Sequence, residues 1–274
     1  MNVALLKTRL KINAGHLIAA SVGWLARAPG HLRVLAFHDV GDDAGDIFAV
    51  TKGQLADCLS LLKDQGYVAV RARDLVAGWP SVLSRERVVL LTFDDGYAAQ
   101  RDIAVELLVR HGMTATFFVI SSLVSRNRLR CVFADKERAF LSGEDLRQME
   151  IAGFEVGSHS HTHALCGAIP RAHFEQESAL SKQILEQELG HPITSFAYPY
   201  GRQRAFSSVT RAVLQESGYS AAFTVEESRI ERDCDLLKLP RTSINRFDTL
   251  ATFRRKLQGQ YDLLGKARRV NGRV

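Results

Sequence analysis

The chain has 274 residues, of which 46% are hydrophobic and 24% charged, with a formal net charge of +6 at pH 7. These values are typical of an ordinary folded globular protein with a sizeable core, and they exclude a chain too polar to fold. Part of the positive charge lies near the two ends without an aromatic-rich motif, so we expect solvated helix faces there and no nucleic-acid partner.

The first 30 residues predict an amphipathic helix. Three basic residues precede the run INAGHLIAASVGWLA, which Asn13 and His16 make too polar and too short for a membrane-spanning helix. The pattern fits a helix that packs on the domain or lies on a membrane surface. A faint cleavage motif ends at Ala28, but Pro29 would follow the cut, so we do not expect a signal peptide.

The four cysteines form no CxxC pair. They therefore predict neither a cysteine-type zinc site nor the disulfide framework of a secreted protein, and they favour a reducing compartment. We expect a cytoplasmic protein, with a peripheral contact to the inner membrane left open.

Short β-rich runs alternate with helical ones along the rest of the chain. The helical runs begin at capping residues such as Thr51 and Ser142 and end at Gly66, Gly112 and Gly190. The expected strands are Arg33–Phe37, Tyr67–Arg71, Val88–Phe93, Ala115–Ile120, Phe154–Gly157, Ser195–Tyr198, Ser220–Phe223 and Leu236–Leu239.

This alternation predicts a parallel sheet with helices outside it. Seven or eight strand–helix units in a chain of this length favour a closed β/α barrel over two domains. We expect the barrel to span residues 31–245, between an N-terminal helical segment (1–30) and a C-terminal helix with a basic tail (246–274).

Polar residues follow several predicted strands at the point where each strand ends. In a β/α barrel these carboxyl ends meet at one face, where catalytic residues collect. The polar residues are His38 and Asp39 in LAFHD, Asp94 and Asp95 in TFDDG, the three histidines of SHSHTH (His159, His161 and His163), Tyr200 in FAYPYG, and Arg241 in LPR.

His159 and His163 are four residues apart, a spacing that brings two imidazoles within reach of one metal ion. An aspartate from a neighbouring strand end would complete a site of two His and one Asp, typical of hydrolytic zinc or a similar divalent metal. The cation would bind one of the paired acids and leave the other as a base. Each motif alone has a structural alternative, such as a helix N-cap or a loop histidine, and their joint occurrence carries the prediction.

The motifs TFDDG, HSHTH and FAYPYG, in this order, resemble those of the polysaccharide deacetylases, the NodB-homology domain of carbohydrate esterase family four. The resemblance extends from about Arg33 to Arg241 and implies a distorted (β/α)7 barrel. It also implies removal of N- or O-acetyl groups from amino sugars or polysaccharides, with a divalent metal that is usually zinc.

By position in these motifs, Asp94 resembles the general base of the family. Asp95, His159 and His163 resemble its metal ligands. Tyr200 resembles the residue whose backbone N–H stabilises the oxyanion.

Two departures from the family pattern change the assignment. First, no histidine motif occurs near the C-terminus, whereas LAFHD resembles the opening of circularly permuted members. His38 is therefore the candidate general acid. Asp39 would point to the other face of an extended strand. Second, Ala197 stands where the family often has an arginine that orients the base. We expect Arg241 to replace it and to contact Asp94.

The expected function is metal-dependent removal of N-acetyl groups from an amino sugar or polysaccharide, in the biosynthesis or modification of a cell-surface glycan. One alternative is a deformylase or other amidase acting on a lipid-linked sugar, and another is a catalytically silent carbohydrate-binding barrel. The expected partner is a carbohydrate, while the oligomeric state stays open. The segment Ser122–Leu141 either lines the substrate groove or only covers the barrel.

Overall fold

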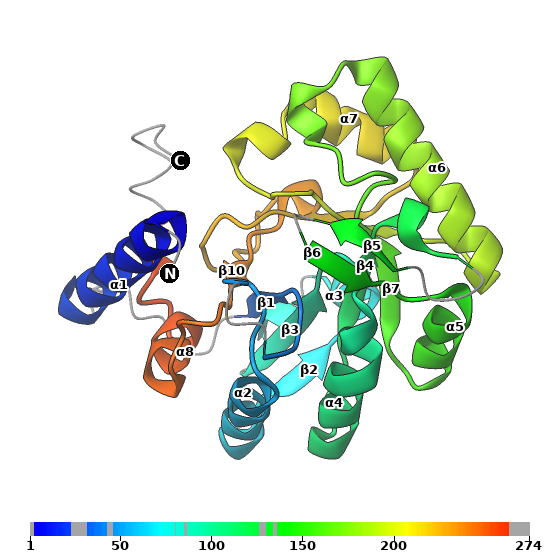
Figure 1. Ribbon diagram of the computed structural model, residues 1–274. Helices are drawn as coiled ribbons and strands as arrows, with labels where there is room; N and C mark the ends of the chain where they lie inside the picture. Colours follow the sequence, from blue (N-terminus) through cyan, green and yellow to red (C-terminus); the bar gives the residue numbers. More distant parts are fainter. Residues whose placement is uncertain are drawn as a thin grey trace.

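The computed structural model describes residues 3–22, 32–42, 46–79, 81–84, 87–125, 130–133 and 136–262. Figure 1 shows a curled sheet with helices around it, and two helices, α1 (Val3–Val22) and α8 (Leu250–Leu257), side by side next to it. None of the described helices is long and apolar enough to cross a membrane.

The main sheet is parallel, as the alternating sequence pattern predicts. Its strands follow the order β10-β1-β3-β4-β7-β8-β9, and β2 pairs with the first half of β3. The strands are β1 (Arg33–Phe37), β2 (Val68–Val70), β3 (Val88–Phe93), β4 (Thr116–Val119), β7 (Glu155–Ser158), β8 (Ser195–Ala197), β9 (Ala221–Phe223) and β10 (Thr242–Ser243).

The helices lie mostly on the outer face of the curled sheet (Figure 1). Capping boxes begin helices at Thr51 and Ser142, as the sequence predicts, and another lies at Ser207. A π-helical turn (Gln100–Ala104) precedes α4. The remaining helices are α2 (Lys52–Asp64), α3 (Ala72–Ala77), α4 (Val105–His111), α5 (Gly143–Ile151), α6 (Arg171–Leu189) and α7 (Ser208–Glu216).

The last part of the sheet differs from the sequence prediction. Residues Leu236–Lys238 form a 3-10 turn rather than a strand, because Asp235 caps them through the backbone N–H of Leu237. Leu239 forms a parallel bridge to Phe223, and Thr242 pairs with β1. Residues 239–243 therefore connect the two edges of the curled sheet, in the manner of a β/α barrel.

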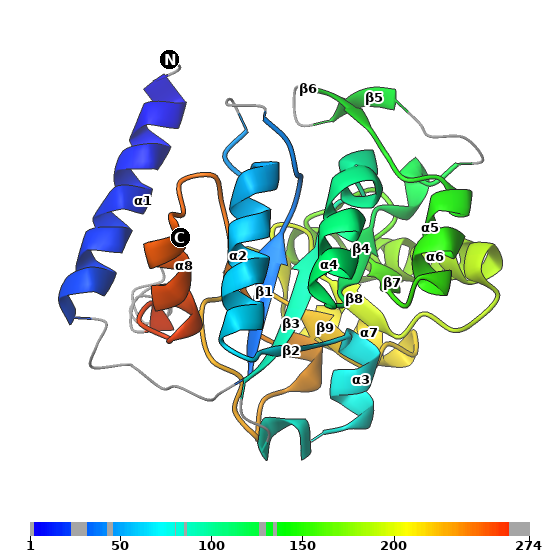
Figure 2. The same cartoon turned by 90° about the horizontal axis from the view of Figure 1, so that it is seen from below.

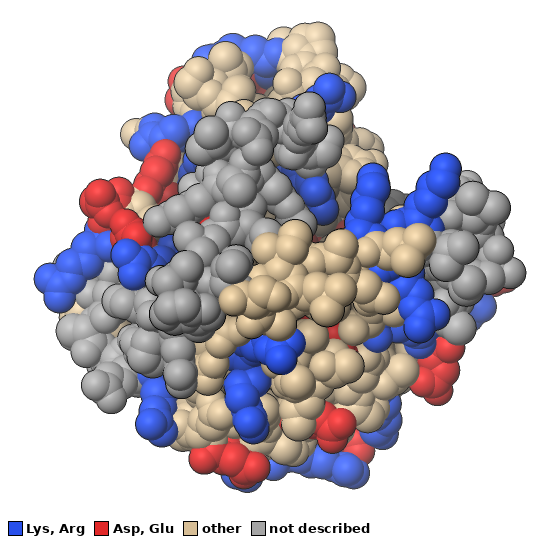
Figure 3. All heavy atoms as spheres, turned by 90° about the vertical axis from the view of Figure 1, so that its left-hand side faces the viewer, with Lys and Arg blue, Asp and Glu red and all other residues tan. Residues whose placement is uncertain are grey.

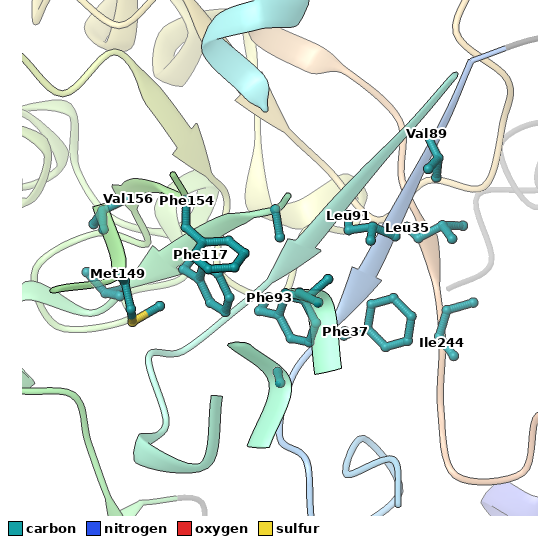
Figure 4. Packing of buried hydrophobic residues seen from close by; sticks show 14 of the residues in the cluster. Leu35, Phe37, Val89, Leu91, Phe93, Phe117, Met149, Phe154, Val156 and Ile244 are labelled. Carbon is teal, nitrogen blue, oxygen red and sulfur yellow. The ribbon is translucent and has the colours of Figure 1, made fainter. Parts of the chain in front are cut away.

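The two faces of β3 separate the outer core from the barrel interior. Val89, Leu91 and Phe93 belong to the core between sheet and helices, and Phe93 stacks on Phe37 and Phe117 with ring centroids 5.2 and 4.9 Å apart (Figure 4). The alternate residues Leu90, Thr92 and Asp94 point to the other side, because successive side chains of a strand alternate. The strand thus delivers Asp94 to the interior at its carboxyl end.

A two-stranded hairpin was not expected from the sequence. It consists of β5 (Arg130–Phe133) and β6 (Lys136–Ala139), within the segment predicted to line or cover the barrel. Figure 2 shows it on the side of the molecule toward which β1 and β3 run. Its end is joined to the turn after β3, because the backbone N–H of Leu141 donates to the carbonyl of Gly96 at 2.8 Å. The hairpin therefore stands at the rim where the candidate site residues meet.

Candidate active site

Asp94 and Arg241 form a buried ion pair in the barrel interior. Nη1 and Nη2 of Arg241 donate to the two carboxylate oxygens of Asp94, each at 2.7 Å, and both side chains are almost fully buried. Arg241 also donates to Thr92 Oγ1 at 3.0 Å and to the carbonyl of Thr224 at 2.9 Å. We expected this contact because Ala197 stands where the family often has an arginine. The two parallel hydrogen bonds fix the plane of the Asp94 carboxylate.

The backbone explains how two neighbouring acids reach one site. In an extended strand Asp94 and Asp95 would point to opposite faces. Asp95 instead has φ 75°, in the left-handed region, and Gly96 continues the turn with φ 80°. A Cβ on Gly96 would lie 3.0 Å from Val119. The tight turn that the sequence predicts there therefore also requires a residue without a side chain.

Asp95, His159 and His163 meet at one point. Nε2 of each histidine lies 3.4 Å from Asp95 Oδ1, and the three potential ligand atoms lie within 4.8 Å of one another. Asp95 Oδ1 is buried and accepts no hydrogen bond from the described residues. Nδ1–H of His159 donates to the carbonyl of Ala197 at 2.8 Å, which turns Nε2 toward the aspartate. The donor set fits a divalent cation.

The charges at this point favour cation binding. Burial raises the pKa of Asp95, but the adjacent imidazoles of His159, His38 and His163 outweigh it and lower the pKa below its usual range. Burial, together with His159, lowers the pKa of His163 to about 4, so its ring is neutral and its nitrogen is available at neutral pH. Burial also raises the pKa of Asp94, yet the Arg241 guanidinium and His159 lower it overall. Both acids are therefore ionised.

His38 completes the rim on the side of β1. Its Nε2 lies 4.0 Å from Asp94 Oδ2, and its ring packs against Phe48 with centroids 4.9 Å apart. Its Nδ1 is buried without a hydrogen-bond partner among the described residues. Asp39 points elsewhere, as the alternation of side chains predicts, and pairs with Arg138 at 2.9 Å.

Tyr200 lies beside the histidine cluster. Its ring centroid is 4.8 Å from that of His163, and its side chain is largely exposed. No described residue accepts a hydrogen bond from its backbone N–H. Four of the five non-glycine residues with positive φ in the described chain are Asp95, Ser160, His163 and Tyr200. Strained backbone is thus concentrated at this site.

Two supporting residues were not predicted from the sequence. The buried carboxylate of Glu177 on α6 accepts hydrogen bonds from the backbone N–H groups of His161 and Thr162, at 3.0 and 2.8 Å, and from the Thr162 hydroxyl at 2.7 Å. It fixes the loop between the two candidate ligands. Gln100 Nε2 donates to the carbonyls of His38 and Asp94 at 3.0 and 2.5 Å and joins the ends of β1 and β3. Their only sequence signal is a polar residue on the buried face of a helix.

His161, between the two candidate ligands, faces away from them. Its Nδ1 lies 2.9 Å from the hydroxyl of Ser121. This agrees with the alternative of a hydrogen-bonded loop histidine.

Comparison with known proteins identifies the class. The family model described as polysaccharide deacetylase matches residues 82–222, just over half of the chain. The protein belongs to this family, whose members are carbohydrate esterase family four hydrolases. The matched range contains Asp94, Asp95, His159, His163 and Tyr200, whereas His38 and Arg241 lie outside it.

Individual relatives agree with this class. The Bacillus subtilis (strain 168) protein YxkH, whose name assigns it provisionally to the polysaccharide deacetylases, is 24% identical over 218 residues, which are 79% of this chain and 72% of YxkH. Among solved structures, the deacetylase PplD of Streptococcus pyogenes is 21% identical with a TM-score of 0.73, covering 84% of this chain and 99% of that one. IcaB of Ammonifex degensii is 24% identical with a TM-score of 0.70, covering 85% and 97%. These two structures share the fold of this chain.

Proposed function

We propose that the protein is a metal-dependent hydrolase that removes N-acetyl groups from an amino sugar or polysaccharide of the cell surface. The proposal is based on two neighbouring carboxylates. Arg241 fixes the buried carboxylate of Asp94, and the carboxylate of Asp95 faces an imidazole nitrogen from each of two histidines. A binding protein needs no base at this position. Ionised Asp94 with its free lone pairs therefore favours turnover over carbohydrate binding alone.

Asp95, His159 and His163 would hold the cation, with zinc as the proposed ion, since zinc prefers this nitrogen and oxygen donor set. A divalent cation held there supplies Lewis acidity at the acyl carbonyl. The residues around it supply the remaining chemistry.

Asp94 would take the proton of the attacking water, because Arg241 keeps it ionised and fixes the direction of its oxygens. The backbone N–H of Tyr200 would donate to the oxygen on which negative charge develops. His38 would donate a proton from its Nε2 to the nitrogen of the leaving amine. This Nε2 lies 4.0 Å from Asp94 Oδ2, on the opposite side of the site from β8. The roles of His38 and Arg241 rest on the geometry of this chain, because both residues lie outside the range matched by the family.

Product analysis with metal analysis of the same sample tests this function. The full chain is incubated with a panel of N-acetylglucosamine oligomers, polymers and lipid-linked acetylated sugars, and released acetate is measured. We expect acetate release that disappears after chelation and returns with added zinc. Formate release from N-formyl sugars, without acetate release, would instead indicate the deformylase. A chain that binds the glycans, holds no metal and releases neither acid would be a silent carbohydrate-binding barrel.

We further propose that α1 rests on an anionic lipid surface, which would place the protein at the cytoplasmic face of a membrane. The helix has no acidic residue, and Leu10, Leu17 and Ile18 are 60%, 70% and 48% exposed. Lys7 and Lys11 flank these side chains and form no ion pair with a described residue. Figure 3 views the molecule from this side, where Lys and Arg side chains lie beside an uncharged surface and Asp and Glu side chains lie toward the edge of the view. Apolar and cationic side chains on one helix face suit anionic lipid.

Vesicle sedimentation tests this contact. We expect the protein to sediment with phosphatidylglycerol vesicles and not with phosphatidylcholine vesicles, and Leu17→Glu to abolish the binding. A matched change on the exposed surface of α5, Ile151→Glu, should leave it unchanged. Equal binding of the wild type and Leu17→Glu would contradict the proposal.

A further inference from the structure

Arg138 joins three separate segments at the rim of the site. It lies on β6 of the hairpin, and its Nη1 donates to Asp39 Oδ2 at 2.9 Å. Its Nη2 donates to the carboxylate of Asp46. Its guanidinium also lies over the ring of Tyr97, 5.4 Å from the centroid. All three charged side chains are 84% or more buried, with exposures of 12%, 11% and 16% for Arg138, Asp39 and Asp46. We name Arg138, Asp39 and Asp46 the Arg138 clamp.

The clamp connects to His38 through two neighbours. Asp39 directly follows His38 in the chain. Asp46 Oδ1 accepts a hydrogen bond from the backbone N–H of Phe48 at 2.8 Å, and the Phe48 ring packs on the His38 ring. No described residue bonds to His38 Nδ1, so the histidine ring depends on packing for its orientation. Phe48, which packs on this ring, is held by its hydrogen bond to Asp46, and Arg138 fixes Asp46.

We propose that Arg138 is a positioning residue for catalysis: it fixes the hairpin and the segment of Phe48 against the end of β1, and thereby keeps His38 directed at Asp94. The physical reason is that the buried guanidinium of Arg138 makes charge-assisted hydrogen bonds to two carboxylates, and these bonds restrict the movement of all three segments at once. A catalytic group displaced by about 1 Å can lose about 100-fold in rate. The kinetic part of this inference rests on the proposed function.

Kinetics of Arg138→Gln test the proposal. We expect kcat to fall by about 10- to 100-fold with little change in KM or metal content. Arg138→Lys keeps the charge and should recover part of the loss. Arg130→Gln is the matched control, because Arg130 lies on the partner strand of the same hairpin and pairs with Glu137 at the surface, where the two side chains are 65% and 64% exposed. It should behave as the wild type. An unchanged kcat in Arg138→Gln, or a loss confined to KM, would overturn the proposal.

A double-mutant cycle separates the clamp from a general effect on stability. Asp46→Asn removes one end of the clamp without changing the hairpin. If the clamp acts as a unit, the kcat of the double variant Asp46→Asn/Arg138→Gln should be no lower than the kcat of the less active single variant. Multiplying losses would contradict a shared role. The single variant Asp46→Asn also keeps the test valid if Arg138→Gln does not fold.

Hydrogen exchange gives a readout that does not depend on any substrate. In Arg138→Gln, amides of residues 46–50 and 136–140 should exchange faster, while those of β3 and β4 should not change. Exchange identical to that of the wild type in both segments would sink the proposal even if the protein acts on none of the sugars tested. Faster exchange in a protein without deacetylase activity would support the clamp and reject only the proposed function.

Discussion

Asp94 and Arg241 are 147 residues apart in the chain, yet they face each other through two parallel hydrogen bonds of 2.7 Å. Both groups are buried, so each depends on the other for charge compensation. In this family member, the arginine that the sequence lacks at Ala197 is supplied from the segment that closes the sheet. Arg241→Met should therefore affect stability and catalysis together.

We expect Arg241→Met to lower the free energy of unfolding by about 3–5 kcal/mol, because it leaves the Asp94 charge buried without a partner. Acetate release should fall close to background. Denaturant unfolding of the metal-free protein measures the first effect. Arg211→Met is the control, since Arg211 pairs with Asp235 at the surface and its removal should change little. A fully active Arg241→Met variant would show that Asp94 needs no arginine.

The two adjacent aspartates should separate in their effects. Asp94→Asn should keep the metal and lose turnover, because the amide cannot take a proton from water. Asp95→Asn should lose metal affinity, because the oxygen that faces both histidines then carries no charge. Metal content after dialysis, measured beside acetate release, checks both outcomes. Full activity of Asp94→Asn would refute its assignment as the base.

Glu177 offers a test at a distance from the metal. Glu177→Gln removes acceptor capacity from the loop that carries His161 and Thr162, between the two candidate ligands. We expect metal affinity to fall by about 10- to 100-fold. Turnover at saturating metal should be largely preserved. Glu175→Gln, on the same helix but exposed and paired with Arg171, should leave the affinity unchanged. Competition with a metal-sensitive dye measures the difference.

Glu155 gives the protein a pH-dependent stability. Its buried carboxyl lies at the start of β7, where burial raises its pKa despite hydrogen bonds from the backbone of Arg73 and the side chain of Ser195. A carboxyl with a raised folded-state pKa contributes stability that is complete below its unfolded pKa and declines as pH rises through the folded pKa. Relative to Glu155→Gln, the wild type should therefore lose stability with rising pH. Urea unfolding from pH 4 to pH 8 checks this, and a gain for the wild type would contradict it.

Much of the site could be predicted because strand ends carry it. The polar residues after β1, β3, β7 and β8 meet as expected, since parallel strands bring their carboxyl ends to one face. The left-handed backbone of Asp95 could not be predicted, because an aspartate in this region is uncommon and tertiary contacts impose it. The 3-10 turn at Leu236 was mistaken for a strand, since a short apolar run fits both. Glu177 and the clamp residues depend on long-range contacts that leave no local pattern.

The path of the chain from Asp94 to Arg241 also has a consequence for biosynthesis. At about 5–20 residues per second, a ribosome adds the intervening residues in roughly 7 to 30 s. During this interval the nascent chain contains the acid without its guanidinium partner, so an ionised Asp94 cannot be buried at low cost. We expect a chain ending before Arg241 to keep β3 accessible to proteases, and the full chain to protect it. Completion of the catalytic centre would then also be the step that commits the newly made protein to its native state.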